Sequence, residues 1–347
     1  MFIKSYWAND MNVSVIIPLY NAEKYIAKAL ESCLALTEVK EILVVDDGYK
    51  DNAKGIVKHY QEKYPVIKLF EHPNNENRGA GESRNVGIRN ATQEYIAFLD
   101  ADDFYLPNRF QEDREVFEKY SDADGCYNAI GSYFYSNKDR EQFTRSSLSE
   151  RTTVNHDTNP SPQNLFQGLL GMISGYGYIH LNGLTLKRDS LFGTGVFFVD
   201  IKVHQDTDFL IKLAFLLKLY PSNLVEDTAV RGVHSENRIT ANEKLRVEEK
   251  SYKRYLMWQS IYSWASDEKM PEKEYDYIKV RKDCYYLLSL SSRSPLALLK
   301  KMSENRNIFR SHLYGSLHRK HFGEGIYARL IYKALNFIIG QGSTKKL

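Results

Sequence analysis

Three aspartates stand close together directly after a short apolar run. The run covers Tyr95 to Leu99, and the acids are Asp100, Asp102 and Asp103. Five apolar residues are too few for a typical helix, so they predict a buried strand that ends where the acids begin. If the backbone stays extended, Asp100 and Asp102 point to one side and Asp103 to the other. Two converging carboxylates suit Mg²⁺ or Mn²⁺, which prefer oxygen ligands and take phosphate as a further one.

A purely structural explanation of these acids is also open. Pro107 is a favoured first residue of a helix, and Asp is favoured just before one. Asp103 is therefore equally consistent with a helix cap. Two acids separated by one residue are a weak signal alone, so the flanking sequence has to decide.

The first hundred residues alternate between strand and helix patterns. The expected strands cover 13–17, 41–45, 66–70 and 95–99. The expected helices cover 21–34, 51–60 and 82–91. Apolar strands that alternate with helices predict a mostly parallel sheet with both faces covered. Ligands of such sheets bind at the carboxyl ends of the strands. Those ends carry Tyr20, Asn21, Asp46, Asp47, Asp100 and Asp102.

Four motifs follow one another through this region. They are Val15-Ile-Ile-Pro-Leu-Tyr-Asn21, Val44-Val-Asp-Asp-Gly48, Asn77-Arg-Gly79 with Ser83-Arg-Asn-Val-Gly87, and Phe98-Leu-Asp-Ala-Asp-Asp103. In order and spacing they resemble the family 2 glycosyltransferases, and the resemblance covers residues 11–110 closely. It implies an α/β fold of the GT-A (Rossmann-like) type, with a mostly parallel sheet flanked by helices, that binds a nucleotide-diphosphate sugar.

The resemblance also implies roles for single residues. Those expected to bind the nucleotide sugar are Pro18, Tyr20, Asn21, Asp46, Arg84, Asp100 and Ala101. Those expected to hold Mn²⁺ or Mg²⁺ are Asp100, Asp102 and His234. Asp46 would recognise the base, because a carboxylate can accept a hydrogen bond from a uracil-type N–H. The chain departs from the family after its paired aspartates, where Gly48-Tyr49-Lys50 replaces the usual Gly-Ser-Thr or Gly-Ser-x.

Each of these residues has a structural alternative. Tyr20 is consistent with packing at a strand end, Arg84 with a solvated helix position and Asp46 with a turn. A lone histidine such as His234 is often structural or exposed. His180 and His204 are weaker candidates, although either could reach an acceptor sugar.

The second half of the chain contains a partial second signature. A polar stretch at 136–163 predicts a long surface loop, and 177–186 alternates like a strand. In Val203-His-Gln-Asp-Thr-Asp-Phe-Leu-Ile-Lys-Leu213, acidic residues introduce an apolar helix. This resembles the family's Glu-Asp followed by x-Asp-Leu, with Gln205 in place of the Glu. The resemblance makes Asp206 the general base.

Glycosyl transfer needs such a base, because a sugar hydroxyl is a poor nucleophile. A carboxylate that takes its proton accelerates attack by about 10²–10⁴-fold. A metal at Asp100 and Asp102 would neutralise charge on the diphosphate, which leaves from the opposite side. Displacement in line inverts the anomeric configuration. The alternative for Asp206 and Asp208 is a helix N-cap, the role expected mainly for Asp208.

Composition and charge limit the remaining possibilities. The 347 residues are 43% hydrophobic and 13% aromatic, which supports a packed core. Three scattered cysteines predict no disulfide framework or zinc cluster and fit a reducing cytoplasm. No apolar run has the length of a membrane span or the form of a signal peptide. Residues 297–347 carry ten Lys or Arg against two Glu, a net +8, which leaves −5 for the rest.

Within this basic tail, 326–339 has a broad apolar face interrupted by Arg329, Lys333 and Asn336. A basic amphipathic helix can lie on an anionic membrane or cover a core. We therefore expect a nucleotide-sugar-binding half at 11–120, an acceptor-binding half of the same GT-A domain at 121–241, and a basic, mainly helical region at 242–347.

The function expected from these features is an inverting, metal-dependent hexosyl- or N-acetylhexosaminyltransferase. It would move one sugar from a nucleotide-diphosphate donor, UDP-linked by preference, to a hydroxyl of a glycan or lipid-linked acceptor. The setting would be bacterial surface polysaccharide or lipopolysaccharide assembly, in the cytoplasm or at the inner face of the plasma membrane. No nucleic acid partner is expected. The lack of Gln-x-x-Arg-Trp and of membrane spans speaks against a processive synthase.

Two other functions stay open. A nucleotide-sugar-binding protein without catalytic activity would retain Asp46, and the change to Gln205 is compatible with it. A sugar-phosphate nucleotidyltransferase would need a Gly-rich loop with Arg and Lys after the first strand. Pro18-Leu-Tyr-Asn21 provides no such loop.

Overall fold

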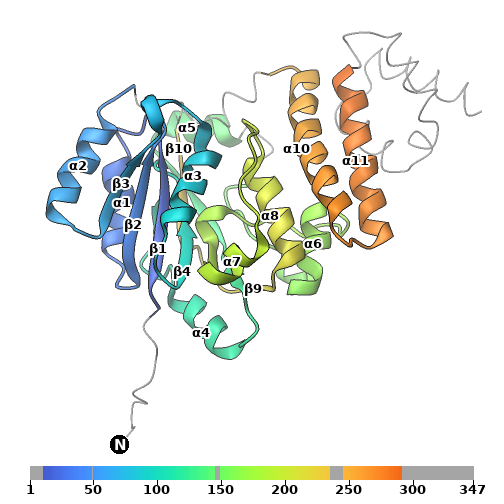
Figure 1. Cartoon of the computed structure of the whole chain (residues 1–347), viewed down its shortest axis with the longest axis horizontal. Coiled ribbons are helices and arrows are strands. Elements are labelled where there is room, and N and C mark those ends of the chain that lie inside the picture. The colour runs from blue at the N-terminus through green and yellow to red at the C-terminus, as the bar shows by residue number, and fades with distance from the viewer. Residues whose placement is uncertain (1–10, 49, 145–148, 235–244, 291–347) are drawn as a thin grey trace, which may run out of the picture. The chain divides into compact units, whose positions relative to one another are not determined.

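The computed structural model describes residues 11–48, 50–144, 149–234 and 245–290 (Figure 1). By its internal contacts the chain divides into two compact units, Met1–Asn237 and Arg238–Leu347. The described part of the second unit consists of α10 (Val247–Asp267) and α11 (Glu272–Leu290), which pack against each other. The α/β fold and the helical C-terminal region predicted from the sequence are confirmed. The expected amphipathic helix at 326–339 lies outside the described residues.

A mostly parallel sheet of seven strands forms the centre of the first unit. Its order is β3-β2-β1-β4-β8-β6-β9. The strands are β1 (Val13–Leu19), β2 (Val39–Asp46), β3 (Ile67–Glu71), β4 (Tyr95–Phe98), β6 (Gly125–Tyr127), β8 (Leu184–Lys187) and β9 (Leu219–Pro221). Only β8 runs antiparallel to its neighbours β4 and β6. The chain order reverses at β1, and in such sheets the cleft beyond the strand ends at this point is where ligands bind.

Helices cover both faces of the parallel strands. The helices are α1 (Ile26–Leu34), α2 (Ala53–Lys63) and α3 (Gly79–Asn90). Figure 1 shows α1 and α2 on one face and α3 on the other. β1 is buried along its whole length, as its mainly apolar sequence predicts. On the α3 side, Gly87 lies so close to Ile16 that a Cβ would collide with the isoleucine side chain.

The first strand continues through Pro18, although the sequence predicts that it stops there. Pro18 pairs with Val45 of β2. The Ile16 carbonyl accepts a hydrogen bond from the Leu99 N–H on the β4 side. Because alternate residues face the same neighbour, Pro18 also faces the β4 side, where pairing ends at Ile16 and Phe98. Its missing N–H therefore costs no ladder hydrogen bond.

A second sheet of three strands lies beyond the first. It has the order β5-β10-β7, formed by Phe104–Tyr105, Ala229–Val233 and Ile130–Phe134. The Gly232 N–H of β10 donates a hydrogen bond of 2.8 Å to Asp103 Oδ1. A Cβ at Gly232 would collide with the Asp102 carbonyl, so the backbone of β10 approaches this turn as only glycine allows.

The remaining helices correct several predictions. They are α4 (Gln111–Lys119), α5 (Asn137–Thr144), α6 (Pro162–Leu170), α7 (Arg188–Thr194) and α8 (Gln205–Leu216). Pro107 lies in a turn and starts no helix. The polar stretch at 136–163 is no continuous loop, because it contains α5 and the short 3-10 helix η2 (His156–Thr158). At 177–186 the strand begins only at Leu184, after the 3-10 helix η3 (Leu181–Gly183).

Glu41 of β2 is hydrogen-bonded to three other segments of the chain. Its carboxylate accepts hydrogen bonds from Lys68 Nζ at 2.5 Å, Ser14 Oγ at 2.5 Å and the Thr92 backbone N–H at 2.9 Å. Burial alone would raise the pKa of Glu41, but these hydrogen bonds outweigh it and lower the pKa. A carboxyl whose folded-state pKa is lowered stabilises the fold above its unfolded-state pKa.

Glu41→Gln is therefore expected to lower the free energy of unfolding at pH 7 by about 1.5–3 kcal/mol, the usual contribution of charge-assisted hydrogen bonds. The difference from wild type should shrink as the pH falls from the unfolded-state pKa of about 4.3 through the lower folded-state pKa. Urea unfolding at several pH values measures it. The matched control is Glu62→Gln, at a side chain that is 77% exposed. Equal destabilisation at pH 7 and pH 3 would contradict the prediction.

Candidate functional site

The acids after β4 lie in a tight turn. The Asp103 N–H donates to the Asp100 carbonyl at 3.0 Å, so the backbone turns where an extended strand was considered. The three carboxylates face different partners. Asp100 Oδ1 accepts from Arg84 Nη2 at 2.5 Å, and Asp102 Oδ2 lies 3.1 Å from His234 Nε2. Ala101 is buried between them. The turn thus presents two half-exposed acids, each beside a basic side chain.

Asp103 is part of the support of this turn and caps no helix, which corrects the alternative considered above. It is buried, and it accepts from Asn182 Nδ2 at 2.5 Å and from the Gly232 N–H. Burial raises the pKa of Asp103, and the carboxylates of Asp102 and Asp100 raise it further. Because α4 begins only at Gln111, the position lies too far from that helix to cap it. Asp103 instead fastens the turn to both η3 and β10.

The fully buried Arg109 is hydrogen-bonded to the backbone of Asn182. Arg109 Nε donates to the Asn182 carbonyl at 2.9 Å, and Nη1 pairs with Asp113 Oδ2 at 2.9 Å. The Asn182 side chain in turn bonds Asp103 and accepts from the Asp100 N–H at 3.3 Å. Sequence reasoning missed both Arg109 and Asn182. The only local signal was the i,i+4 spacing of Arg109 and Asp113, which many exposed helix pairs share.

His234 reaches the site from the end of β10. Its ring stacks on Tyr25 at 4.3 Å between centroids, and Tyr135 packs edge-on at 6.0 Å. These contacts hold Nε2 toward Asp102, and the side chain is 9% exposed. Of the predicted metal ligands, Asp102 and His234 therefore lie together, while Asp100 faces Arg84.

The donor set at this point is one carboxylate and one imidazole. Within the described ranges, no three His, Cys, Asp or Glu side chains are grouped closely enough to hold a metal by themselves. Mg²⁺ sites commonly use only one or two carboxylates and complete their coordination with substrate phosphates and water. The pair Asp102 and His234 fits the protein's share of such a site.

Arg84 is buried in α3 and is no solvated helix residue. Its guanidinium lies 5.4 Å from the ring centroid of Phe198 and donates to Asp100. The position places a permanent positive charge at the edge of the turn. A guanidinium there suits an anionic ligand such as a diphosphate.

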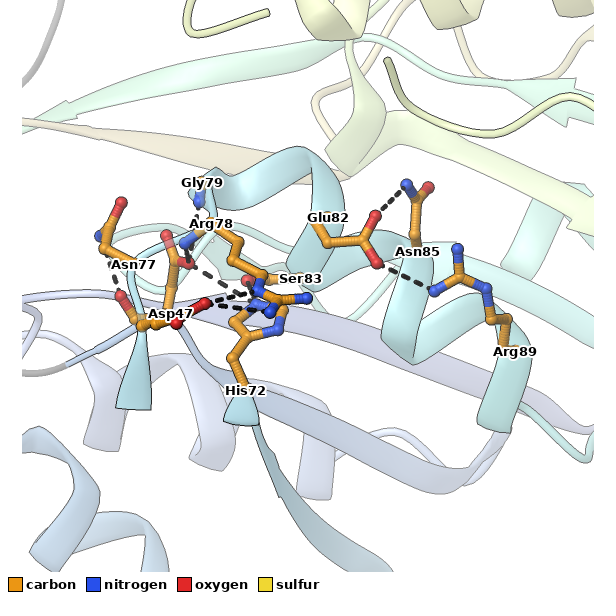
Figure 2. A network of polar contacts seen from close by, with 10 residues as sticks. Asp47, His72, Asn77, Arg78, Gly79, Glu82, Ser83, Asn85 and Arg89 are labelled. Carbon is orange, nitrogen blue, oxygen red and sulfur yellow. Dashed lines mark hydrogen bonds and ion pairs between the residues drawn. The ribbon is translucent and has the colours of Figure 1, made fainter. Parts of the chain in front are cut away.

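The beginning of α3 is docked on Asp47 (Figure 2). Asp47 Oδ1 accepts from the N–H groups of Arg78 and Gly79 at 2.7 and 2.9 Å. Its carbonyl accepts from Asn77 Nδ2 at 2.8 Å, and His72 Nε2 lies 3.6 Å from its carboxylate. Gly79 has a φ of +85°, which other residues rarely adopt. Asp47 therefore fixes the helix that carries Arg84.

Asp46 lies at the end of β2 with its side chain 1% exposed. Lys54 Nζ of α2 is 3.5 Å from Oδ2, and neither carboxylate oxygen accepts a hydrogen bond within the described residues. Burial raises the pKa of Asp46, although Lys54 acts in the opposite direction. A buried carboxylate with open acceptor positions is unusual, because such groups normally have hydrogen-bond partners.

The other residues predicted at the nucleotide lie beside it, at the end of β1. Pro18 is the partner of Val45, and Asp46 pairs with Leu19, the residue before Tyr20. Asn21 has a φ of +49° and accepts from the Lys50 N–H at 3.1 Å. Tyr20 is half-buried. No described hydrogen bond or ion pair joins Asp46 to the turn at 100–103.

Asp206 lies in the first turn of α8 and is half-buried. His204, with a φ of +67°, is the N-cap residue, so neither Asp206 nor Asp208 takes that position, and the prediction for Asp208 is wrong. Asp208 is buried and pairs with Lys212 Nζ at 2.7 Å. Gln205 is buried against α3, where a Cβ on Gly81 would collide with its side-chain oxygen.

His180 interacts electrostatically with both Asp100 and Asp206. Burial lowers the pKa of its imidazole, while the carboxylates of Asp100 and Asp206 act to raise it. Its Nδ1 accepts the Asn182 N–H at 3.2 Å. The structure thus places Asp100, Asp102, Arg84 and His234 together beyond the end of β4, and Gln205, the residue before Asp206, packs against Gly81 of the helix that carries Arg84.

The sequence is similar to those of several known proteins. The sequence matches the family described as Glycosyl transferase family 2 over residues 14–178. A glycosyltransferase of Nostoc sp. (strain PCC 7120), itself uncharacterised, is 40% identical over 111 residues, which cover 31% of this chain and 33% of that protein. The minor teichoic acid biosynthesis protein GgaA of Bacillus subtilis is 27% identical over 216 residues, 60% of this chain and 44% of that protein. The matches thus span less than half of these relatives.

The similarity in fold to solved structures extends over more of the chain than the similarity in sequence. The S. aureus TarS 1-349 structure in complex with UDP-GlcNAc has a TM-score of 0.60 and covers 97% of this chain and 93% of that chain, at 18% identity. None of the helices that the structure describes combines the length and apolar character needed to cross a bilayer. Residues 14–178 therefore match glycosyl transferase family 2, and the first unit has the GT-A fold.

Proposed function

We propose that the chain is an inverting, metal-dependent glycosyltransferase that moves one sugar from a UDP-sugar to a hydroxyl of a glycan or lipid-linked acceptor. The proposal is supported by the turn at 100–103, which has Arg84 and His234 beside its acids, and by Asp206 in the first turn of α8, which lies within electrostatic reach of His180 as Asp100 does. A diphosphate at the turn and a base across from it are the two requirements of in-line displacement at the anomeric carbon. In-line attack with one carboxylate base inverts the configuration.

The nucleotide is assigned to the ends of β1 and β2. Asp46 offers buried acceptor oxygens for the N3–H of uracil, and Asn21 and Tyr20 lie beside it. Pro18 keeps the strand end free of an unpaired N–H. Arg84, whose guanidinium lies at Asp100, and the backbone around Ala101 would bind the diphosphate.

The metal is assigned to Asp102 and His234, with Mn²⁺ or Mg²⁺ as the ion. When bound it would supply positive charge to the departing diphosphate. Asp100 contributes by holding the Arg84 guanidinium, which adds a second positive charge to the same region. Asp206 takes the proton of the attacking hydroxyl.

Two relatives suggest where the activity belongs. One is named a minor teichoic acid biosynthesis protein, and a solved structure of similar fold contains UDP-GlcNAc. We therefore propose an N-acetylhexosaminyl or hexosyl donor and a surface-polysaccharide acceptor, including those of teichoic acid or lipopolysaccharide type. The enzyme would act in the cytoplasm, at the inner face of the membrane when its acceptor is lipid-linked. Residues 11–120 would bind the donor, 121–241 the acceptor, and 242–347 would form the basic helical region.

A panel of nucleotide sugars tests the proposal. We expect UDP-GlcNAc or another UDP-sugar to raise the melting temperature, since a ligand that binds only the folded state stabilises it. We also expect UDP release that requires Mn²⁺ or Mg²⁺ and stops with EDTA. Binding without UDP release for every acceptor offered would favour a catalytically silent binding protein. Pyrophosphate release from UTP and a sugar 1-phosphate would identify a nucleotidyltransferase instead.

A further inference from the structure

One group at the site has no role in the proposed reaction so far. His180 immediately precedes η3, and both Asp100 and Asp206 interact electrostatically with its ring. In the proposed reaction Asp100 belongs to the diphosphate side and Asp206 to the side of the attacking hydroxyl. During in-line displacement the transferred sugar lies between those two sides. His180 is bonded to the Asn182 N–H, and the Asn182 side chain accepts from the Asp100 N–H, so its ring is held beside the acidic turn and within reach of that sugar.

The hydrogen bonding of His180 determines what it can offer a ligand. Nδ1 accepts the Asn182 N–H, so it carries no proton. In a neutral imidazole the proton is then on Nε2, which is a donor. No described residue makes a hydrogen bond to Nε2, and the side chain is only half-buried. The ring consequently has one oriented N–H group that no described residue uses.

The orientation of this ring is coupled to the turn that holds the acids. Asn182, whose N–H binds Nδ1, uses its side chain to bond Asp103 and the Asp100 N–H. Arg109 holds the Asn182 carbonyl from beneath. His180 and the turn at 100–103 are thus fixed by the same residue, as is required of a group that must stay in register with the diphosphate.

We propose that His180 donates a hydrogen bond from Nε2–H to a hydroxyl or acetamido oxygen of the sugar being transferred, and so contributes to the choice of donor sugar. The inference rests on the proposed glycosyl transfer. It makes His180 a specificity-determining residue that contacts the sugar and leaves the nucleotide untouched.

The chain itself offers a substitution that separates this role from a structural one. Asn155 begins η2 in the same way that His180 begins η3, and its Oδ1 accepts the Asp157 N–H at 3.0 Å. Asparagine therefore caps a 3-10 helix of this protein. His180→Asn should keep the cap through Oδ1 and lose the donor at the Nε2 position. His180→Gln should lose the cap, while its longer amide reaches the Nε2 position with an N–H donor.

The test measures the binding of UDP-GlcNAc and of UDP to wild type and both variants in the presence of Mn²⁺, together with their melting temperatures. We expect His180→Asn to melt near wild type, to bind UDP normally and to bind UDP-GlcNAc about fivefold to tenfold more weakly, the effect of one neutral hydrogen bond. His180→Gln should melt lower and yet bind UDP-GlcNAc more tightly than His180→Asn. The order of the two variants in binding is then opposite to their order in stability.

A purely structural role gives the same order in both measurements, with His180→Asn the better variant, and that result would overturn the inference. Equal weakening of UDP and UDP-GlcNAc would overturn it as well, because the contact would then not be to the sugar. If wild type binds neither ligand nor any other UDP-sugar, the proposed function fails and this inference with it. If wild type binds UDP-sugars and both variants bind them equally well, only the inference fails.

Discussion

Asp206→Asn is expected to lower kcat by about 10²–10⁴-fold, the range for loss of a general base. The amide cannot take the proton of the attacking hydroxyl, although it has nearly the same shape as the carboxylate. UDP binding should stay unchanged, because Asp206 lies across from the diphosphate in the proposed reaction. Initial rates of sugar transfer and calorimetric binding of UDP measure the two effects.

The matched control is Asp189→Asn in α7. Its side chain is 88% exposed, and the neighbouring Lys187 pairs with Tyr95 at the amino end of β4, the end opposite to the site. This variant should behave as wild type. Transfer by Asp206→Asn at the wild-type rate would assign the base to another residue and remove the proposed role of α8.

Asp102→Asn is expected to lower kcat by about 10²–10³-fold, the usual effect of removing one group that stabilises charge in the transition state. It should also raise the Mn²⁺ concentration needed for half-maximal activity, because an amide is a weaker ligand than a carboxylate. Stability should change little, because the side chain is 30% exposed and partly exposed polar contacts such as that with His234 contribute little to stability. Metal titration of the transfer rate, with melting curves, separates the two effects.

Asp100→Asn provides the comparison within the same turn. Asp100 pairs with Arg84 and is not assigned to the metal, so its variant should lower the rate without shifting the Mn²⁺ titration. If Asp100→Asn shifts the Mn²⁺ titration and Asp102→Asn does not, the metal is held by Asp100 and the assignment to Asp102 is wrong.

The first hundred residues show why one half of the fold could be predicted. β1, β2 and β4 each contain a buried apolar run within a parallel sheet, and such runs can be recognised from the sequence alone. The motif acids follow these strands directly, so predicting the strands also placed Asp46, Asp100 and Asp102 at the carboxyl edge of the sheet.

The fold of the second half was harder to predict from the sequence, because its helices and strands are short. β6 has three residues and β8 has four, too few for periodicity to separate a strand from a turn. α5 contains only eight residues in a polar stretch and could be mistaken for a loop. These elements form because the first sheet offers an edge to pair with, and a single sequence window does not contain that edge.

The support of the site was hidden for a related reason. Asn182 is distant in sequence from Arg109 and Asp103, and it meets them only after β8 has joined β4. The bend between Asp100 and Asp103 depends on these partners, so an isolated window suggested an extended chain. His234 could be placed after its strand, but its stacking on Tyr25 could not.

The close approach of β10 to the acidic turn has a wider consequence. At Gly232 even a methyl group would press on the Asp102 carbonyl, and His234 follows two residues later, directly after the end of β10. A single added carbon would therefore displace the backbone of Asp102 directly and His234 through the end of β10. Gly232 has no side chain that could take part in the reaction, and yet its replacement should be tolerated as poorly as replacement of Asp102 or His234.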